Sequence, residues 1–168
     1  MDFRPNDDDG PTYDVPFHDE ARSQDGWQGQ GTSLSYDTLK RDVTAAIARL
    51  GGVTHSLQRG DYTIGNKKRP GVRINYSLEG PKGNMVYGRI DVAALPIRPP
   101  AQRANWQRTE RAREDLSIRM ALYNVIAALR SQWVLKQLNP SWVRPAQPVR
   151  PASQTNAYPW FEERLKKK

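Results

Sequence analysis

The chain contains no cysteine and only two histidines, His18 and His55. Without cysteine it has no disulfide, no thiolate metal site and no cysteine nucleophile. Neither histidine has a second histidine at the spacing of metal ligands, so a zinc site is not expected. A Walker loop and a G-x-G-x-x-G motif are also missing. We therefore predict a protein that has no cofactor, no metal and no enzymatic activity.

Long apolar runs and targeting signals are absent as well. No apolar stretch approaches the roughly 18 residues that a membrane-spanning helix needs. The first six residues have neither the basic region nor the apolar region of a secretory signal. These absences predict that the protein does not enter a membrane and that it lies in the cytoplasm or another intracellular compartment.

Charge is distributed unevenly along the chain. Residues 1–33 hold eight acidic residues and two arginines, a net charge of −6, whereas residues 34–168 carry a net charge of +14. A body this basic attracts polyanions, and an acidic arm tethered to it competes for the same surface. Deleting the arm is then expected to tighten polyanion binding. Two other roles for the arm stay open, namely recruitment of another protein and no role at all.

Composition divides the chain into three segments. Residues 1–33 combine one-sided charge with apolar residues that have no period, which predicts an acidic disordered arm. Residues 34–142 form the predicted α+β domain. Residues 143–168 form a basic Pro/Arg-rich tail, in which the sequence Val-Arg-Pro-Ala occurs twice and the proline density disfavours a packed element.

The domain is expected to begin with a helix and three strands. Apolar residues recur at helical spacing over residues 36–50, between Ser35 as N-cap and Gly51 as the stop signal. Polar and apolar residues then alternate in three stretches, which is the pattern of half-buried strands. These stretches are 53–58, 72–78 and 85–94, and the basic segment 65–71 is expected to be a loop between the first two.

A long helix is predicted to complete the domain. The proline-rich connector 95–100 leads into it, and the helix runs from about residue 102 to Leu138. The predicted fold class is therefore α+β in the order α-β-β-β-α, with an antiparallel three-stranded meander packed by one amphipathic helix and one long C-terminal helix. The segment Leu116–Leu138 is apolar around most of its girth, which predicts cover on several sides and self-association as a homo-oligomer.

Basic residues gather at three places in this predicted fold: the basic loop, the polar faces of the last two strands, and the start of the long helix. Arginine suits phosphate because its planar fork binds two oxygens at once, and an open sheet face that carries Arg and Tyr is able to hold phosphates and stack bases. The alternative is an ordinary solvated surface with the same residue types. The predicted nucleic-acid contacts are Lys67, Lys68, Arg69, Arg73, Tyr87, Arg89, Arg98, Arg103 and Arg108.

The order of elements resembles two groups of proteins. Double-stranded-RNA-binding domains share it, but their second helix opens with glycine and then lysines, where this chain has Leu-Pro-Ile-Arg-Pro-Pro at 95–100. The β-β-β-α core of single-strand annealing proteins is more similar, since there a meander precedes a helix of the kind seen over residues 109–130. Small uncharacterised phage and mobile-element proteins show the same order. The resemblance covers at most residues 34–138 and implies single-stranded nucleic acid and oligomer formation.

These observations lead to three functional hypotheses. The first is a non-enzymatic nucleic-acid-binding protein for single-stranded DNA or RNA, with the acidic arm modulating binding. The second is a structural or adaptor subunit that docks through its basic and aromatic tails into a protein or ribonucleoprotein assembly. The third is a metal-dependent nuclease, which would need acids at strand ends. The residues considered for it are Asp61, Glu79, Lys82 and Asp91.

Overall fold

The computed structural model describes residues 2–3, 14–64, 67–80, 82–99, 106–138 and 161–165, with only the backbone described at residue 2, 106–108 and 161–165. The helices and strands follow one another in the predicted order, so the α+β class and the order α-β-β-β-α are confirmed. In chain order the elements are β1 (Asp2–Phe3), the 3-10 helices η1 (His18–Glu20) and η2 (Ser23–Asp25), α1 (Tyr36–Arg49), β2 (Gly52–Ile64), β3 (Lys67–Glu79), β4 (Met85–Ala93), α2 (Trp106–Leu138) and β5 (Phe161–Leu165).

The sheet is built around the predicted meander. Strands β2, β3 and β4 pair antiparallel in sequence order, which confirms this part of the prediction. Two short strands from the ends of the chain add to the edges, β1 parallel to β2 and β5 antiparallel to β4. Both edges of the meander are therefore partly covered by terminal segments of the same chain.

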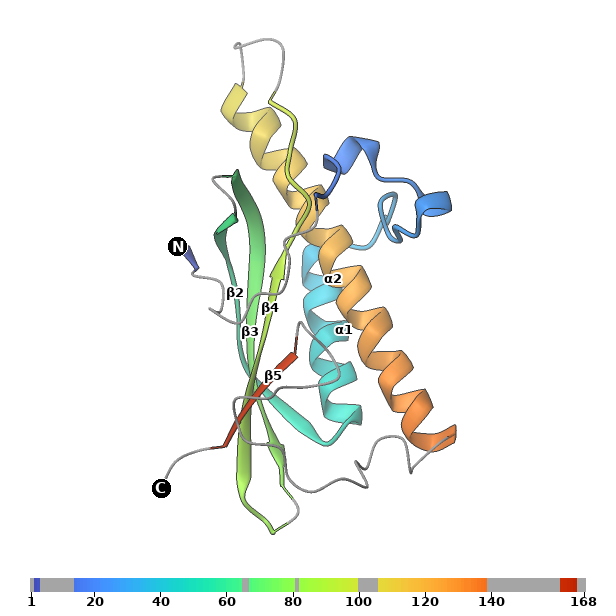
Figure 1. Cartoon of the computed structure of the whole chain (residues 1–168), viewed down its shortest axis with the longest axis vertical. Coiled ribbons are helices and arrows are strands. Elements are labelled where there is room, and N and C mark those ends of the chain that lie inside the picture. The colour runs from blue at the N-terminus through green and yellow to red at the C-terminus, as the bar shows by residue number, and fades with distance from the viewer. Residues whose placement is uncertain are drawn as a thin grey trace.

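Both helices lie side by side on one face of the sheet (Figure 1). Alternate residues of β3, Val72, Ile74 and Tyr76, point toward the helices and are at most 2% exposed. The helices supply aliphatic side chains to the same core, such as Leu39 and Leu122, which are both fully buried. Burying each such side chain contributes roughly 1.5–3 kcal/mol, so the two-layer packing accounts for much of the stability of the fold. The opposite face of the sheet, here called the open face, carries no helix of the described chain.

Helix α1 begins and ends at the residues that the sequence predicts. The Ser35 hydroxyl accepts a hydrogen bond from the amide of Thr38 at 3.1 Å, as an N-cap does. After the helix, Gly51 has a φ of 88°, a left-handed conformation that glycine adopts without the strain of a β-carbon. The tight turn at Gly51 sends the chain directly into β2.

Helix α2 has two apolar faces with different cover. One face, which includes Ile118 and Leu129, packs on the sheet and α1. The other face, represented by Met120, packs against Ala21 and Leu95, with Trp27 alongside. The arm therefore covers part of the apolar surface of α2 for which the sequence predicted a second copy of the chain. Within the residues that the structure describes, no helix combines the length and apolar character that crossing a membrane requires.

The prediction of a disordered arm over residues 1–33 is wrong for residues 14–33. This segment contains η1 and η2, and Ala21 is fully buried. The His18 amide donates to the Pro96 carbonyl at 2.9 Å, and the Asn124 side chain donates to the Gln28 carbonyl at 2.8 Å. One-sided charge suggested disorder, but a few small and apolar side chains are enough to dock the segment on α2.

Two further predictions need correction. The basic segment 65–71 is not a loop from end to end, because β3 begins at Lys67 and pairs with β2 as far as Ile64. The basic tail 143–168 also contains a packed element, β5, opposite Val86–Ile90 of β4. Pairing with a neighbouring strand overrides local composition in both places. The predicted start of the long helix at residue 102 lies outside the described residues, as does most of the tail.

Candidate nucleic-acid interface

Basic residues of the β2–β3 hairpin lie at two levels, with Lys67 and Lys68 at the hairpin end and Arg59 in the middle of β2, opposite Val72. Lys67 and Lys68 open β3 and are exposed, and Arg59 of β2 points toward the helices. The Arg59 guanidinium lies 5.0 Å from the ring centroid of Tyr36 and 3.3 Å from a carboxylate oxygen of Asp115 in α2. Arg59 thus ties the middle of β2 to both helices, and the hairpin end lies beside the first half of α2 (Figure 1).

The charges that act on Glu114 come from the same two parts of the chain. Burial, more than any other cause, raises the pKa of the Glu114 carboxyl above its ordinary value, and the nearby acids Glu110 and Asp61 add to this. Lys68 and Arg59 act in the opposite direction. Residues of β2 and β3 therefore lie within electrostatic range of the first turns of α2.

The residues Arg59, Lys67, Lys68 and Arg111 together form what we call the basic end, whereas Arg113 of α2 donates to the Arg98 carbonyl beside the arm. Its acids are partly engaged, because Asp61 pairs with Lys68 at 3.4 Å and Asp115 pairs with Arg59 and also with Arg119. Lys67 and Arg111 are exposed, and no carboxylate among the described residues forms an ion pair with either. The predicted basic segment and the predicted Arg-rich helix start are thus brought to one end of the molecule.

Arg98 is held by the acidic arm. Its guanidinium pairs with Asp19 at 3.2 Å and with Glu20, and it also lies 5.2 Å from the ring centroid of Phe17. The backbone carbonyl of Arg98 accepts a hydrogen bond from Arg113 at 3.2 Å. A cavity of about 420 Å³ opens beside these side chains. Two arm carboxylates therefore neutralise the Arg98 guanidinium.

Arg69 has a different environment from its neighbours in sequence. Its guanidinium donates to the backbone carbonyls of Ala94 and Ala93, each at 2.9 Å, just beyond the end of β4. Burial lowers the pKa of Arg69 from its ordinary value. This arrangement fixes the chain where β4 leaves the sheet, beside a cavity of about 440 Å³ that Met120 and Trp27 also line.

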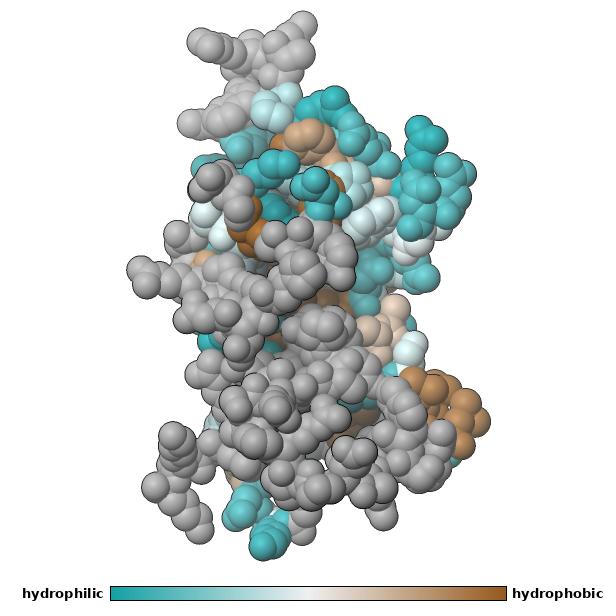
Figure 2. Space-filling model, in the orientation of Figure 1, coloured by the Kyte–Doolittle hydropathy of each residue, from teal (hydrophilic) through white to brown (hydrophobic). Residues whose placement is uncertain are grey.

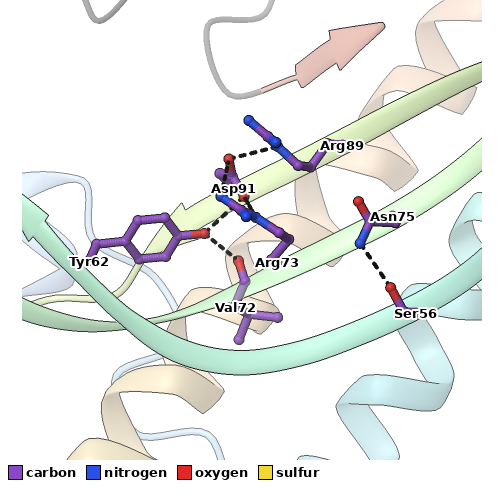
Figure 3. A network of polar contacts seen from close by, with 7 residues as sticks. All are labelled: Ser56, Tyr62, Val72, Arg73, Asn75, Arg89 and Asp91. Atoms are coloured by element: carbon purple, nitrogen blue, oxygen red, sulfur yellow. Dashed lines mark hydrogen bonds and ion pairs between the residues drawn. The ribbon is translucent and has the colours of Figure 1, made fainter. Parts of the chain in front are cut away.

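On the open face of the sheet, Arg73 and Arg89 converge on one acid. Arg73 donates to Asp91 at 2.7 Å, and Arg89 lies 3.0 Å from the second oxygen of the same carboxylate (Figure 3). The hydroxyl of Tyr62 lies 3.0 Å from Asp91 and 3.1 Å from the Val72 carbonyl. Burial first, and then the charge of Asp91, raises the pKa of Tyr62 well above its ordinary range. The network joins all three central strands.

Tyr87 lies farther along the open face. Its ring stacks on that of His55, with centroids 5.9 Å apart and an interplanar angle of 26°. His55 reaches this face where the register of β2 shifts between Thr54 and Ser56, and its Nε2 lies 2.7 Å from the Ser77 hydroxyl. The predicted stacking residue is thus on the open face with Arg73 and Arg89, but away from the basic end.

The nine predicted contact residues are therefore divided among several places. Lys67 and Lys68 belong to the basic end, Arg73, Tyr87 and Arg89 to the open face, Arg98 to the arm contact, and Arg69 to the end of β4. Arg103 lies outside the described residues, and of Arg108 only the backbone is described. That these residues contact nucleic acid stays a prediction.

Sequence reasoning missed the aromatic part of the open face. Phe3 and Tyr62 are in contact there. The sequence predicts only a disordered arm around Phe3 and no site at Tyr62. One signal was present in the sequence: Gly71 interrupts the alternating pattern of β3, and a glycine inside a strand often marks a close approach of another group. Here the approaching group is the Tyr62 ring.

The acids considered for a nuclease have other partners or positions. Asp91 is bonded by Arg73 and Tyr62, Asp61 pairs with Lys68, and Glu79 ends β3 far from both. Among the side chains that the structure describes, no three His, Cys, Asp or Glu residues are grouped as a metal site would need.

Comparisons of this chain with protein-family models, with curated proteins and with solved structures gave no match.

Proposed function

We propose that this protein is a non-enzymatic nucleic-acid-binding protein whose basic end holds the phosphate backbone of single-stranded DNA or RNA. The observation that carries the proposal is the junction of two cationic segments that are distant in sequence. The ion pair between Arg59 and Asp115 joins β2 to α2, and Lys68 at the hairpin end acts on the Glu114 carboxyl of α2, so Lys67 and Arg111 lie toward the same end of the molecule.

Charge supports a polyanionic ligand. Residues 34–168 carry a net charge of +14, and lysine and arginine side chains that contact phosphates release counterions from the nucleic acid. The arm adds a device for control, because Asp19 and Glu20 neutralise Arg98 in the absence of a ligand. The open face adds aromatic rings close to the hairpin end, which favours a single strand with accessible bases over a duplex.

The proposal is tested by charge reversal at the basic end. The double variant Lys67→Glu/Arg111→Glu removes two exposed cations without breaking a described ion pair. We expect it to bind fluorescent single-stranded oligonucleotides more weakly, and the slope of log affinity against log salt to fall by about two units, one for each lost phosphate contact. Fluorescence anisotropy at several salt concentrations measures both quantities, with duplex DNA and RNA as further ligands.

A matched control is available at the far end of the molecule. Lys82 and Lys136 are also exposed, and they lie about 40 Å from Lys67 along β3 and from Arg111 along α2, respectively. The variant Lys82→Glu/Lys136→Glu changes the net charge by the same amount. If both variants lose affinity equally, binding follows total charge and the proposed interface is wrong. If the parent protein binds no oligonucleotide, the proposed function is wrong.

A further inference from the structure

On the open face, the side chain of Tyr62 lies parallel to the sheet and is fixed at both its ring and its hydroxyl. The ring of Tyr62 lies across β3 at Gly71, so closely that a β-carbon at Gly71 would be only 2.3 Å from the ring. The tyrosine hydroxyl is anchored by Asp91 and by the Val72 carbonyl (Figure 3). Glycine below the ring and two acceptors at its tip hold Tyr62 in one orientation, with the ring directed along the sheet surface.

This platform is covered by a residue from the N-terminal arm. Phe3 packs on Tyr62 with ring centroids 5.1 Å apart, and only 3% of Phe3 is exposed. The guanidinium of Arg73 lies 4.5 Å from the centroid of the Phe3 ring. Tyr62 and Arg73 thus form a cradle, and the phenyl ring that fills it comes from β1, which pairs with β2 over two residues.

The cradle has the chemistry of a base-binding site. An aromatic ring and a guanidinium attract the π-face of a planar ring, and this attraction tolerates every base because each base has such a face. Hydrogen-bonding side chains that could meet a base edge follow on the same face: Asn75 donates to Ser56 at 2.9 Å (Figure 3).

We propose that the Tyr62–Arg73 cradle binds a nucleobase of a single-stranded nucleic acid, and that Phe3 fills the cradle when no ligand is bound. This inference rests on the proposed function and adds to it a specific contact and a form of self-inhibition. The cradle is well placed for the role, because Tyr62 pairs in register with Arg69, and Lys67 lies only two residues, about 7 Å, farther along β3. A strand held by the basic end passes within reach of the cradle.

Phe3 is suited to be displaced. A strand of two residues contributes few hydrogen bonds and is marginal alone, so its hold depends mainly on the buried ring. Apparent affinity falls in proportion to the fraction of molecules in which a site is competent. If Phe3 fills the cradle in about nine of ten molecules, removing its ring raises base-dependent affinity about tenfold.

The test compares two phenylalanines of the same arm. Phe3→Ala empties the cradle, whereas Phe17→Ala removes a ring that lies against a different arginine, Arg98, outside the cradle. The ligands are a fluorescent 15-mer of deoxythymidylate and an abasic 15-mer with the same number of phosphates. We expect Phe3→Ala to bind the thymidylate 15-mer about tenfold more tightly and the abasic 15-mer with unchanged affinity. Phe17→Ala should show no such preference.

Any other result would contradict base binding at the cradle. Equal tightening for both 15-mers would mean that the gain comes from phosphate access, and no tightening would mean that Phe3 is only a structural residue. A change in molecular mass by light scattering without a change in affinity would assign the cradle to Phe3 of a second copy. Loss of binding to both 15-mers in every variant and in the parent protein would overturn the proposed function as well.

A second measurement does not depend on the fold of a variant. Photo-crosslinking of a 5-iodouracil oligonucleotide to the unaltered protein should modify Tyr62, and a Phe-containing peptide with the sequence of residues 1–6 in excess should reduce the yield. Crosslinks only at residues outside the open face would contradict the proposal.

Discussion

At the scale of single residues, Gly71 determines where Tyr62 can lie. A β-carbon there would meet two carbons of the Tyr62 ring at 2.3 and 2.4 Å and the Val92 carbonyl oxygen at 2.5 Å. Neither neighbour is free to move, because the ring is hydrogen-bonded at its tip and the carbonyl belongs to β4. A methyl group added at Gly71 would therefore push against both the backbone of β4 and the Tyr62 ring of the open-face network.

We expect Gly71→Ala to lower the free energy of unfolding by about 1–3 kcal/mol, the usual cost of overpacking. Urea denaturation measures this change. Gly31→Ala is the control, since a β-carbon at Gly31 would meet nothing within 4 Å. Similar stability of the two variants would show that the Tyr62 ring shifts easily and that the cradle is not rigid.

At the scale of elements, the arm is the unit that differs most from its expected form. Residues 14–33 dock on α2 and on the connector after β4, and they present Asp19 and Glu20 to Arg98. The ion pairs of Asp19 and Glu20 with Arg98 agree with one of the three roles that the sequence left open for the arm, in which it folds back on the basic body. The burial of Ala21 did not follow from the sequence, because a lone alanine has no period to distinguish it.

The arm contact yields a charge-matched comparison. Asp19→Asn/Glu20→Gln removes the carboxylates that pair with Arg98, whereas Asp14→Asn/Asp25→Asn removes two exposed arm acids for which no ion pair is found among the described residues. Surface ion pairs are each worth about 0–1 kcal/mol. The first variant should therefore bind oligonucleotides about threefold to fivefold more tightly than the second in anisotropy titrations. Equal affinities would mean that the arm acts through its total charge.

Periodicity explains which elements were predictable. Helix α1, with Ser35 and Gly51 at its ends, and the cores of β2, β3 and β4 follow from patterns that local sequence carries. Strands β1 and β5 do not, because a short edge strand exists only through its neighbour. The candidate site divides in the same way: the cations were visible in the sequence, but their carboxylate partners come from other strands and from the arm.

At the scale of the whole molecule, several exposed apolar side chains gather at the end of α2. Figure 2 shows it as a brown patch at the lower right, where Val134, Leu135 and Leu138 are 44%, 39% and 76% exposed. The arm covers the side of α2 around Met120, so the predicted self-association has a narrower surface than Leu116–Leu138. A contiguous apolar patch of this kind is typical of an interaction site.

Self-association through this patch predicts a mass near twice the 19.1 kDa of the chain in light scattering after size exclusion. The variant Leu135→Glu/Leu138→Glu should return the mass to that of one chain, since burying two carboxylates at an apolar contact is costly. Two exposed residues elsewhere, in Thr44→Glu/Lys82→Glu, provide the control. A single-chain mass for the unaltered protein at all concentrations would contradict the predicted homo-oligomer.

Strands β1 and β5 affect how readily the sheet edges of one molecule can pair with another. β1 and β5 occupy stretches of β2 and β4 whose amide and carbonyl groups would otherwise face outward. An uncapped strand is a template on which further chains can polymerise. β1 pairs with only Asp61 and Tyr62 of β2, whereas β5 pairs with Val86–Ile90 of β4, so removing β5 would expose the longer stretch of such a template.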